Sequence, residues 1–421
     1  MRAFPCLLIL LCAAFFKTDA QVVSKMISNN IASAQLFSYG NQQGFPVYTL
    51  NSGQKLQLEF DDLEGGYKNY YFNFILCDYN WSPCNLSPFD YLKGFTMNRI
   101  TNYRNSNIAL TNYTHYQAFF PDNNSTPTKS GNYLLKVFLD GDTSKIVFTK
   151  QFIVVEDKAK VSAEVIQPFN PALFYTHQQI KFSATISGIN SFSAAQQVRA
   201  VILQNNRWDN ALRDINPSFI RGNALEFTRN DLAIFPAGKE WRWVELSSLR
   251  LLSDRVEHAD FGKTSTDFYL KTDVDKSAQR YVYFPDLNGM YELRTLERRN
   301  PFTQGDYATV HFSFASKKLE KDLFLVGSFT NYHQDDKWKM SYNEEKGLYE
   351  ASAFLKQGYY NYSYMTSSDD TKFSNEFEGN YFETENSYTI ILYYRGFADR
   401  CDKIIGFKQF NSRLDRPGMR F

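Results

Sequence analysis

The sequence predicts an all-β protein made of tandem β-sandwich domains. Aromatic residues form 17% of the chain, with 38 Phe and 28 Tyr, and aromatic side chains favour strands. Apolar and polar residues alternate in many short segments that end at turn residues, which is the pattern of half-buried strands. No segment repeats a helix after a strand, as a parallel βαβ sheet requires. Stacked β-sandwiches are therefore the expected architecture.

Composition limits the classes of function. The chain has 421 residues, enough for two to four domains. Its 46 basic and 45 acidic residues give a net charge of +1, so bulk electrostatics favours neither nucleic acid nor an anionic membrane as a partner. Hydrophobic residues at 43% and charged residues at 22% exclude a disordered chain.

The first twenty residues read as a secretory signal peptide. The apolar run Cys6–Phe16 is shorter than a membrane-spanning helix, and Ala20 supplies a small residue at the cleavage position. We expect cleavage after residues 1–20 and a mature chain that starts at Gln21; a lipoprotein signal at Cys12 is the alternative. After Gln21 no apolar run approaches the length of a membrane helix, so we expect no direct membrane insertion.

The first predicted domain covers residues 21–157. Apolar and polar residues alternate in Leu56–Phe60, and the acidic and Gly-rich stretch Asp61–Gly66 predicts a turn. Alternation resumes over Tyr70–Leu76, and the strand signal Tyr133–Leu139 ends at a strong Asp-Gly turn.

The second predicted domain covers residues 161–300, after a short polar boundary at 157–160. Val198–Leu203 is apolar nearly throughout, which is typical of a strand covered on both faces. Leu249, Leu252 and Val256 have roughly helical spacing and predict the one helix of this region.

The third predicted domain covers residues 301–421, since Pro301 restricts the residue before it and polar residues precede it. Further along, Tyr360, Tyr362 and Tyr364 share one face of a predicted strand. Such a face either packs in the core of a sandwich or forms an exposed aromatic platform for sugars or a partner protein. The platform interpretation groups Tyr360 with Tyr332 and Trp338.

Three cysteines follow the signal peptide. In an oxidising compartment Cys77 and Cys84 can close a small loop around Trp81, or stay reduced, because spacing does not show whether their Cβ atoms face each other. Cys401 then reads as a small buried apolar residue.

The sequence carries no motif that points to chemistry. The histidines lack metal-site spacing, and the phosphate-binding loops and nucleophile motifs with local signatures are absent. Acidic pairs such as Asp61-Asp62 stand beside turn residues, which favours turn chemistry over a pair of catalytic carboxylates. We therefore expect no enzyme activity, no catalytic or metal-binding residues and no cofactor.

Three segments of the third domain resemble the early-set β-sandwich that includes the glycogen-binding modules. They are Phe324–Tyr332 (FLVGSFTNY), Gly347–Glu350 (GLYE) and Gly358–Tyr362 (GYYNY). The resemblance implies an immunoglobulin-like fold. The sugar-binding residues differ, because Tyr332 stands where these modules have Trp and the expected Lys is replaced near Ser363, so the resemblance does not extend to starch or glycogen binding.

A longer series of motifs covers most of the mature chain. In order they are Ser52-Gly53, Phe60–Leu63, Tyr70-Tyr71, Cys77-Asp78 with Trp81, Ser130–Tyr133, Arg207–Asn210 (RWDN), Gly379–Asn386 (GNYFETEN) and Tyr393–Arg395. In this order they resemble the plug protein family of the type 9 secretion system of Bacteroidota. The resemblance implies a periplasmic protein that docks on the outer-membrane translocon β-barrel and closes its periplasmic mouth when no substrate is in transit. A periplasmic or surface glycan-binding protein that uses the third domain is the alternative.

Overall fold

The described residues of the computed structural model, 24–188, 194–369 and 372–415, form three β-sandwiches, so the predicted all-β fold class is confirmed. The expected signal peptide at residues 1–20 and the mature start at Gln21 lie outside them. In this part of the chain no helix is long and apolar enough to cross a membrane. The helical elements are single turns: α1 (Pro88–Tyr91), α2 (Ala194–Gln197), α3 (Pro301–Gln304), η2 (Ser328–Thr330) and η3 (Asp336–Trp338).

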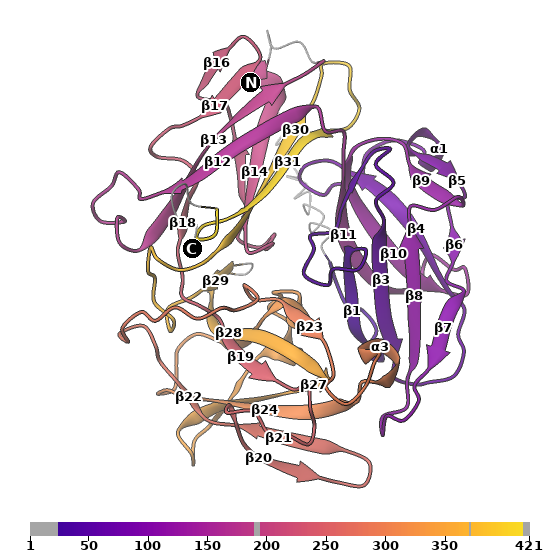
Figure 1. Cartoon of the computed structure of the whole chain (residues 1–421), viewed down its shortest axis with the longest axis vertical. Coiled ribbons are helices and arrows are strands. Elements are labelled where there is room, and N and C mark those ends of the chain that lie inside the picture. Colours follow the sequence, from indigo (N-terminus) through magenta and orange to yellow (C-terminus); the bar gives the residue numbers. More distant parts are fainter. Residues whose placement is uncertain (1–23, 189–193, 370–371, 416–421) are drawn as a thin grey trace, which may run out of the picture.

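The first sandwich holds the strands on the right of Figure 1. Its strands are β1 (Ile31–Ser38), β2 (Val47–Thr49), β3 (Leu56–Asp62), β4 (Tyr70–Cys77), β5 (Leu92–Gly94), β6 (Asn98–Arg99), β7 (Asn102–Asn105), β8 (Thr114–Phe120), β9 (Ser125–Pro127), β10 (Gly131–Leu139) and β11 (Ile146–Val155). The two main sheets have the orders β1-β3-β8-β7 and β2-β11-β10-β4-β6. The alternation predicted from Tyr70 to Leu76 is confirmed, because Tyr70, Phe72, Phe74 and Leu76 are all buried in the core between these sheets.

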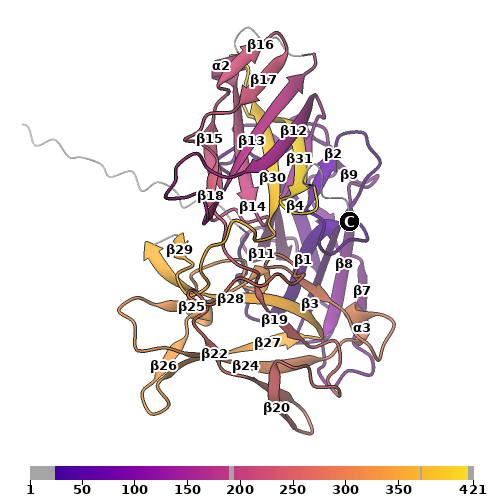
Figure 2. The ribbon, with the colours of Figure 1, turned by 60° about the vertical axis from the view of Figure 1, so that its left-hand side comes forward.

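The second sandwich lies at the top of Figures 1 and 2. Its strands are β12 (Ala159–Ile166), β13 (His177–Ile186), β14 (Val198–Gln204), β15 (Leu212–Ile215), β16 (Phe219–Arg221), β17 (Ala224–Phe227), β18 (Ile234–Pro236), β30 (Ser387–Tyr394) and β31 (Lys403–Asn411). One sheet has the order β12-β13-β17-β16 with β18 beside β13, and the other has the order β15-β14-β30-β31.

The third sandwich lies below the second in both views. Its strands are β19 (Arg242–Glu245), β20 (Val256–Phe261), β21 (Thr266–Leu270), β22 (Asp273–Val274), β23 (Tyr291–Leu293), β24 (Tyr307–Ala315), β25 (Leu323–Val326), β26 (Ser341–Asn343), β27 (Leu348–Lys356), β28 (Gly358–Asp369) and β29 (Lys372–Ser374). The order β19-β28-β23 faces β20-β21-β24-β27-β26, with β25 and β29 beside β28 and β22 beside β24.

The third sandwich is inserted into the second. The chain leaves the second sandwich after β18 and returns to it with β30 and β31, which Figure 1 shows in yellow beside the magenta β14. The sheets therefore divide the chain differently from the predicted ranges 161–300 and 301–421: residues 242–293 pair within the third sandwich and residues 387–411 within the second. Pairing such as Val201 opposite Ile391 joins strands almost 200 positions apart, and alternation within a strand does not reveal its partner.

Two local predictions have opposite outcomes. β14 is covered on both faces as expected, because Ile202 packs in the core of the second sandwich while Val201 and Leu203 pack against the first. The helix predicted around Leu252 is wrong. This stretch is irregular and ends in β20, and the Leu252 side chain is 46% exposed, so the helical spacing does not correspond to an apolar face.

Candidate functional site at the joints between the sandwiches

The contact between the first and the third sandwich, called here the first–third joint, is built around a buried carboxylate. Asp61 on β3 accepts hydrogen bonds from the Lys356 ammonium at 2.5 Å and the Tyr307 hydroxyl at 2.6 Å, both from the third sandwich. It also contacts Nδ1 of His115 on β8 at 2.7 Å. Asp61 is 1% exposed and Lys356 is 0% exposed. Asp61 therefore lies in a strand and a joint, and its expected role in a turn is wrong.

The charges in this joint balance when His115 is protonated. Nε2 of His115 contacts Glu59 at 2.6 Å, so two carboxylates face two cations. Burial lowers the pKa of His115, but the hydrogen bonds with Asp61 and Glu59 outweigh burial and hold that pKa above its ordinary value. Burial raises the pKa of Asp61, but Lys356 and His115 outweigh it and hold that pKa below the usual range. Removal of any one partner from such a buried group should destabilise the fold, because the remaining charge is left unpaired and out of water.

The first–second joint is apolar. The outer face of the sheet with β10 and β11 packs against the outer face of the sheet with β14, β30 and β31. The side chains in this layer that are at most 2% exposed are Cys77, Trp81, Leu134, Ile153, Val155, Val201, Leu203, Ile391, Tyr393 and Ile404. Burial of each large apolar side chain contributes about 1.5–3 kcal/mol, so the layer fixes the two sandwiches against each other.

A disulfide crosses the same joint. Cys84 of the first sandwich is bonded to Cys401 of the β30–β31 connection, 317 positions away, with their Cα atoms 5.7 Å apart. Of the two alternatives left open by the sequence, the pairing of Cys77 with Cys84 is therefore wrong, and Cys77 is a free thiol. Cys77 packs in the apolar layer of the joint, whereas Cys84 and Cys401 pack at the core of the first sandwich. Burial raises the pKa of the Cys77 thiol to about 12.

The second–third joint stacks a guanidinium on aromatic rings. Arg207 follows β14 and binds Asp209 through Nε at 3.0 Å and through a second nitrogen at 2.5 Å. Its Cζ lies 4.9 Å from the centroid of the Tyr332 ring and 5.9 Å from that of Trp241. The Tyr332 hydroxyl donates to the Gly289 carbonyl at 2.9 Å. Arg207 thus links the second sandwich to the third by cation–π contacts.

The predicted aromatic platform does not form. Tyr360 is 2% exposed and stacks on Tyr291 with the ring centroids 5.1 Å apart. Tyr332 is engaged in the second–third joint, and Trp338 packs edge-on against Phe329. Tyr360, Tyr362 and Tyr364 all lie in the hydrophobic core of the third sandwich, so this face of β28 is core. The packing interpretation is confirmed, and the glycan alternative loses the residues on which it depended.

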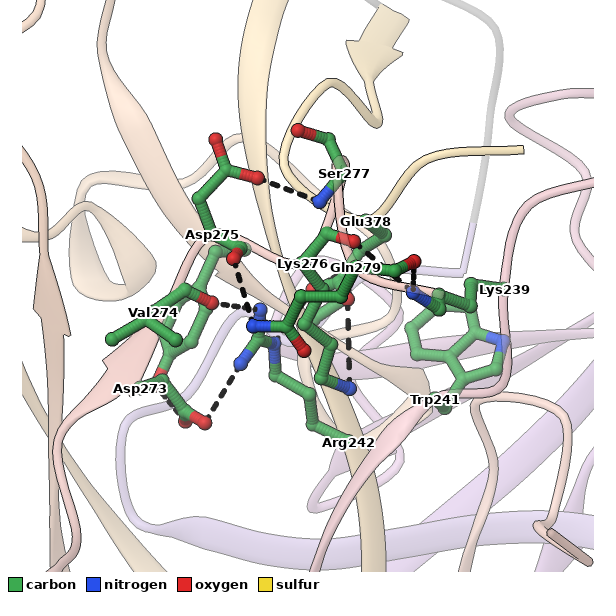
Figure 3. A network of polar contacts seen from close by, with 12 residues as sticks. Lys239, Trp241, Arg242, Asp273, Val274, Asp275, Lys276, Ser277, Gln279 and Glu378 are labelled. Carbon is green, nitrogen blue, oxygen red and sulfur yellow. Dashed lines mark hydrogen bonds and ion pairs between the residues drawn. The ribbon is translucent and has the colours of Figure 1, made fainter. Parts of the chain in front are cut away.

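Both linkers of the inserted sandwich are clamped together. Arg242 ends the outgoing linker, and its guanidinium donates to Asp273 at 2.7 Å, to the Val274 carbonyl at 2.8 Å and to Glu378 of the returning linker at 2.6 Å. Figure 3 shows these side chains gathered around Arg242. A second contact, from the Gly238 amide to the Asn380 side chain at 2.9 Å, joins the same linkers. Arg242 is 4% exposed, so this clamp is buried.

Motifs that were far apart in the sequence meet at these joints. The Asn132 side chain donates to the Asp78 carbonyl and accepts from the Tyr393 hydroxyl, each at 2.8 Å. Trp81 of the first sandwich packs edge-on against Trp208 of the second, with the ring centroids 4.9 Å apart. The motifs that resemble the plug family therefore include residues that hold the sandwiches together.

Sequence reasoning missed three joint residues: Lys356, Tyr307 and Arg242. Each is a polar residue within a strand, and the segments around them carry no local signal of a partner beyond the same strand. Among the described residues no group of three or more His, Cys, Asp or Glu side chains could hold a metal ion. The contacts at the joints are suited to fixing the three sandwiches relative to one another.

Comparisons with known proteins give a family and a structural relative. Residues 31–156, which hold the strands of the first sandwich, match the family model described as type 9 secretion system plug protein 1st domain. The crystal structure of a hypothetical protein from Parabacteroides merdae ATCC 43184 is similar over 93% of this chain and 100% of that chain, with a TM-score of 0.89 and 31% sequence identity. No curated protein matches the chain.

Proposed function

Because the chain belongs to the family of that Parabacteroides merdae protein, and its residues 31–156 to the family of plug protein first domains, we propose that it is a non-enzymatic plug subunit of the type 9 secretion system. In this proposal it is periplasmic, docks on the outer-membrane translocon β-barrel and occludes the periplasmic opening when no substrate is in transit. The single observation that carries the proposal is the match of residues 31–156 to the plug family.

The joints support a steric mechanism. A plug must keep its shape when it blocks an opening, and three sandwiches that move independently would do so poorly. An apolar layer, a disulfide and buried ion pairs hold the three sandwiches together in this chain. Release then requires substrate or a competing partner to favour the open complex by a difference in binding free energy.

Two exposed aromatic residues are suited to contact the partner. Phe89 is 78% exposed and Phe397 is 82% exposed. In the sequence Phe89 follows Cys84 closely and Phe397 shortly precedes Cys401, so the disulfide ties their two segments together. Exposed aromatic anchors on preorganised segments lose little entropy on binding. We therefore expect Phe89 and Phe397 to contribute to docking.

Affinity purification of the tagged mature protein from its native envelope in mild detergent tests the proposal. Near-stoichiometric recovery of a large outer-membrane barrel by mass spectrometry is expected. Recovery of the protein alone, or with polysaccharide-utilisation components, would contradict the plug role. The F89S/F397S variant should recover several-fold less barrel, whereas F169S, which removes an aromatic residue 80% exposed on another loop, should recover the normal amount.

A further inference from the structure

A cavity of about 840 Å³ lies where the three sandwiches meet. Its wall takes residues from the first sandwich, among them Lys150 on β11, from the second, among them Trp208 and Arg213, and from the third, among them Tyr291. Its volume lies within the range of roughly 300–1,000 Å³ that small-molecule sites occupy.

The wall carries two cations that have no acidic partner among the described residues. Lys150 donates to the Asn331 side chain at 2.8 Å and Arg213 donates to the Tyr79 carbonyl at 3.1 Å. Neither forms an ion pair with a carboxylate in the described part of the chain. Of the two carboxylates in the wall, Asp209 is held by Arg207, and Asp335 is exposed. The cavity therefore favours an anion.

Unpartnered polar atoms belong to the same wall. The side-chain oxygen of Gln35, the indole nitrogen of Trp81 and the amide nitrogen of Gln151 are buried and lack a hydrogen-bond partner among the described residues. These side chains are 8%, 1% and 8% exposed, respectively. Buried polar groups in proteins are normally paired, so each of these side chains can satisfy one more hydrogen bond by turning toward a ligand in the cavity.

We propose that this cavity binds a carboxylate-bearing ligand with an apolar or aromatic body. The carboxylate lies on the side of Lys150, and the body packs against the aromatic part of the wall, which includes Trp81, Trp208 and Tyr291. The ligand is a free small molecule or the carboxyl end of a peptide. Because all three sandwiches line the cavity, an occupant contacts each of them and stabilises their arrangement.

Isothermal titration of the full mature protein tests this proposal with two pairs of probes. The first pair is 2-naphthoate and the neutral 2-naphthalenemethanol, and the second is a leucyl-phenylalanine dipeptide and its C-terminal amide. At least one acid should bind ten times or more tightly than its neutral analogue. Binding of naphthoate alone identifies a free small molecule, binding of the dipeptide alone identifies a chain end, and each outcome supports recognition of a carboxylate.

The K150M variant tests whether the acid binds in this cavity. Lys150 donates to the neutral side chain of Asn331 rather than to a carboxylate, so Met at this position leaves no buried charge without a partner and should keep the fold intact. K150M should bind the acid at least tenfold more weakly, whereas K136M, which removes a partly exposed lysine on β10 outside the wall, should bind it normally. Failure of both acids to bind at millimolar concentration, equal affinity for acid and neutral analogue, or unchanged affinity in K150M would overturn the proposal.

Discussion

Replacement of Lys356 by Met should open the first–third joint. Met keeps most of the length of the side chain and removes the ammonium that lies 2.5 Å from the Asp61 carboxylate. The carboxylate keeps the Tyr307 hydroxyl and His115 as partners, but the buried group acquires a net negative charge. Loss of one partner from a buried ion pair costs about 3–5 kcal/mol.

Hydrogen exchange measures this cost where it occurs, which matters because a chain of several sandwiches need not unfold in one step. A loss of about 3 kcal/mol corresponds to roughly a hundredfold increase in the opening equilibrium. Peptides that cover β3 and β27 should therefore exchange about a hundred times faster in K356M, while peptides from β14 should exchange at the normal rate.

The D61N/K356M double variant separates charge from packing. Asn has nearly the shape of Asp, so the double variant removes both charges and should cost less than the two single changes together, by about 1–3 kcal/mol. K136M is the control for the loss of a partly exposed lysine. Exchange in K356M within threefold of the wild type, or strictly additive effects in the double variant, would refute the reasoning.

Three further predictions concern the other contacts. Because the pKa of His115 is raised in the folded state, the stability that protonated His115 contributes is complete below pH about 6.5 and is lost as pH rises through the folded pKa. Thermal unfolding over a pH series should show this decline in stability in the wild type and a smaller decline in H115Q. Equal slopes in the two proteins would contradict the prediction. C401S should lower the free energy of unfolding by about 4–5 kcal/mol, as expected for a long closed loop. Peptide mapping of the wild-type protein without reductant should recover Cys84 joined to Cys401 and no other pairing. R242M should cost about 3–5 kcal/mol in chemical denaturation, because two carboxylate partners stay buried, and a loss below about 1 kcal/mol would count against the clamp.

The sequence predicted which residues are buried where apolar residues alternate with polar ones, or follow one another, within a single strand. Alternation from Tyr70 to Leu76 identified the buried face of β4, and the apolar run from Val198 identified a strand covered on both faces. Both inferences need only the residue itself and its neighbours in the strand.

Partners far away in the chain could not be predicted in this way. Nothing near Cys84 indicates Cys401, and nothing near β14 indicates that β30 returns beside it after the inserted sandwich. Asp61 has the sequence context of a turn, yet a lysine 295 positions away makes a buried strand position favourable for it. The joints depend on such contacts between distant residues, so the residues that hold the sandwiches together were the hardest to predict from the sequence.

Conductance of the translocon barrel in a planar bilayer tests the plug role most directly. Addition of the mature protein to the periplasmic side should close the open channel, and F89S/F397S should close it several-fold less well than F169S. A channel that stays open at saturating protein would contradict the account.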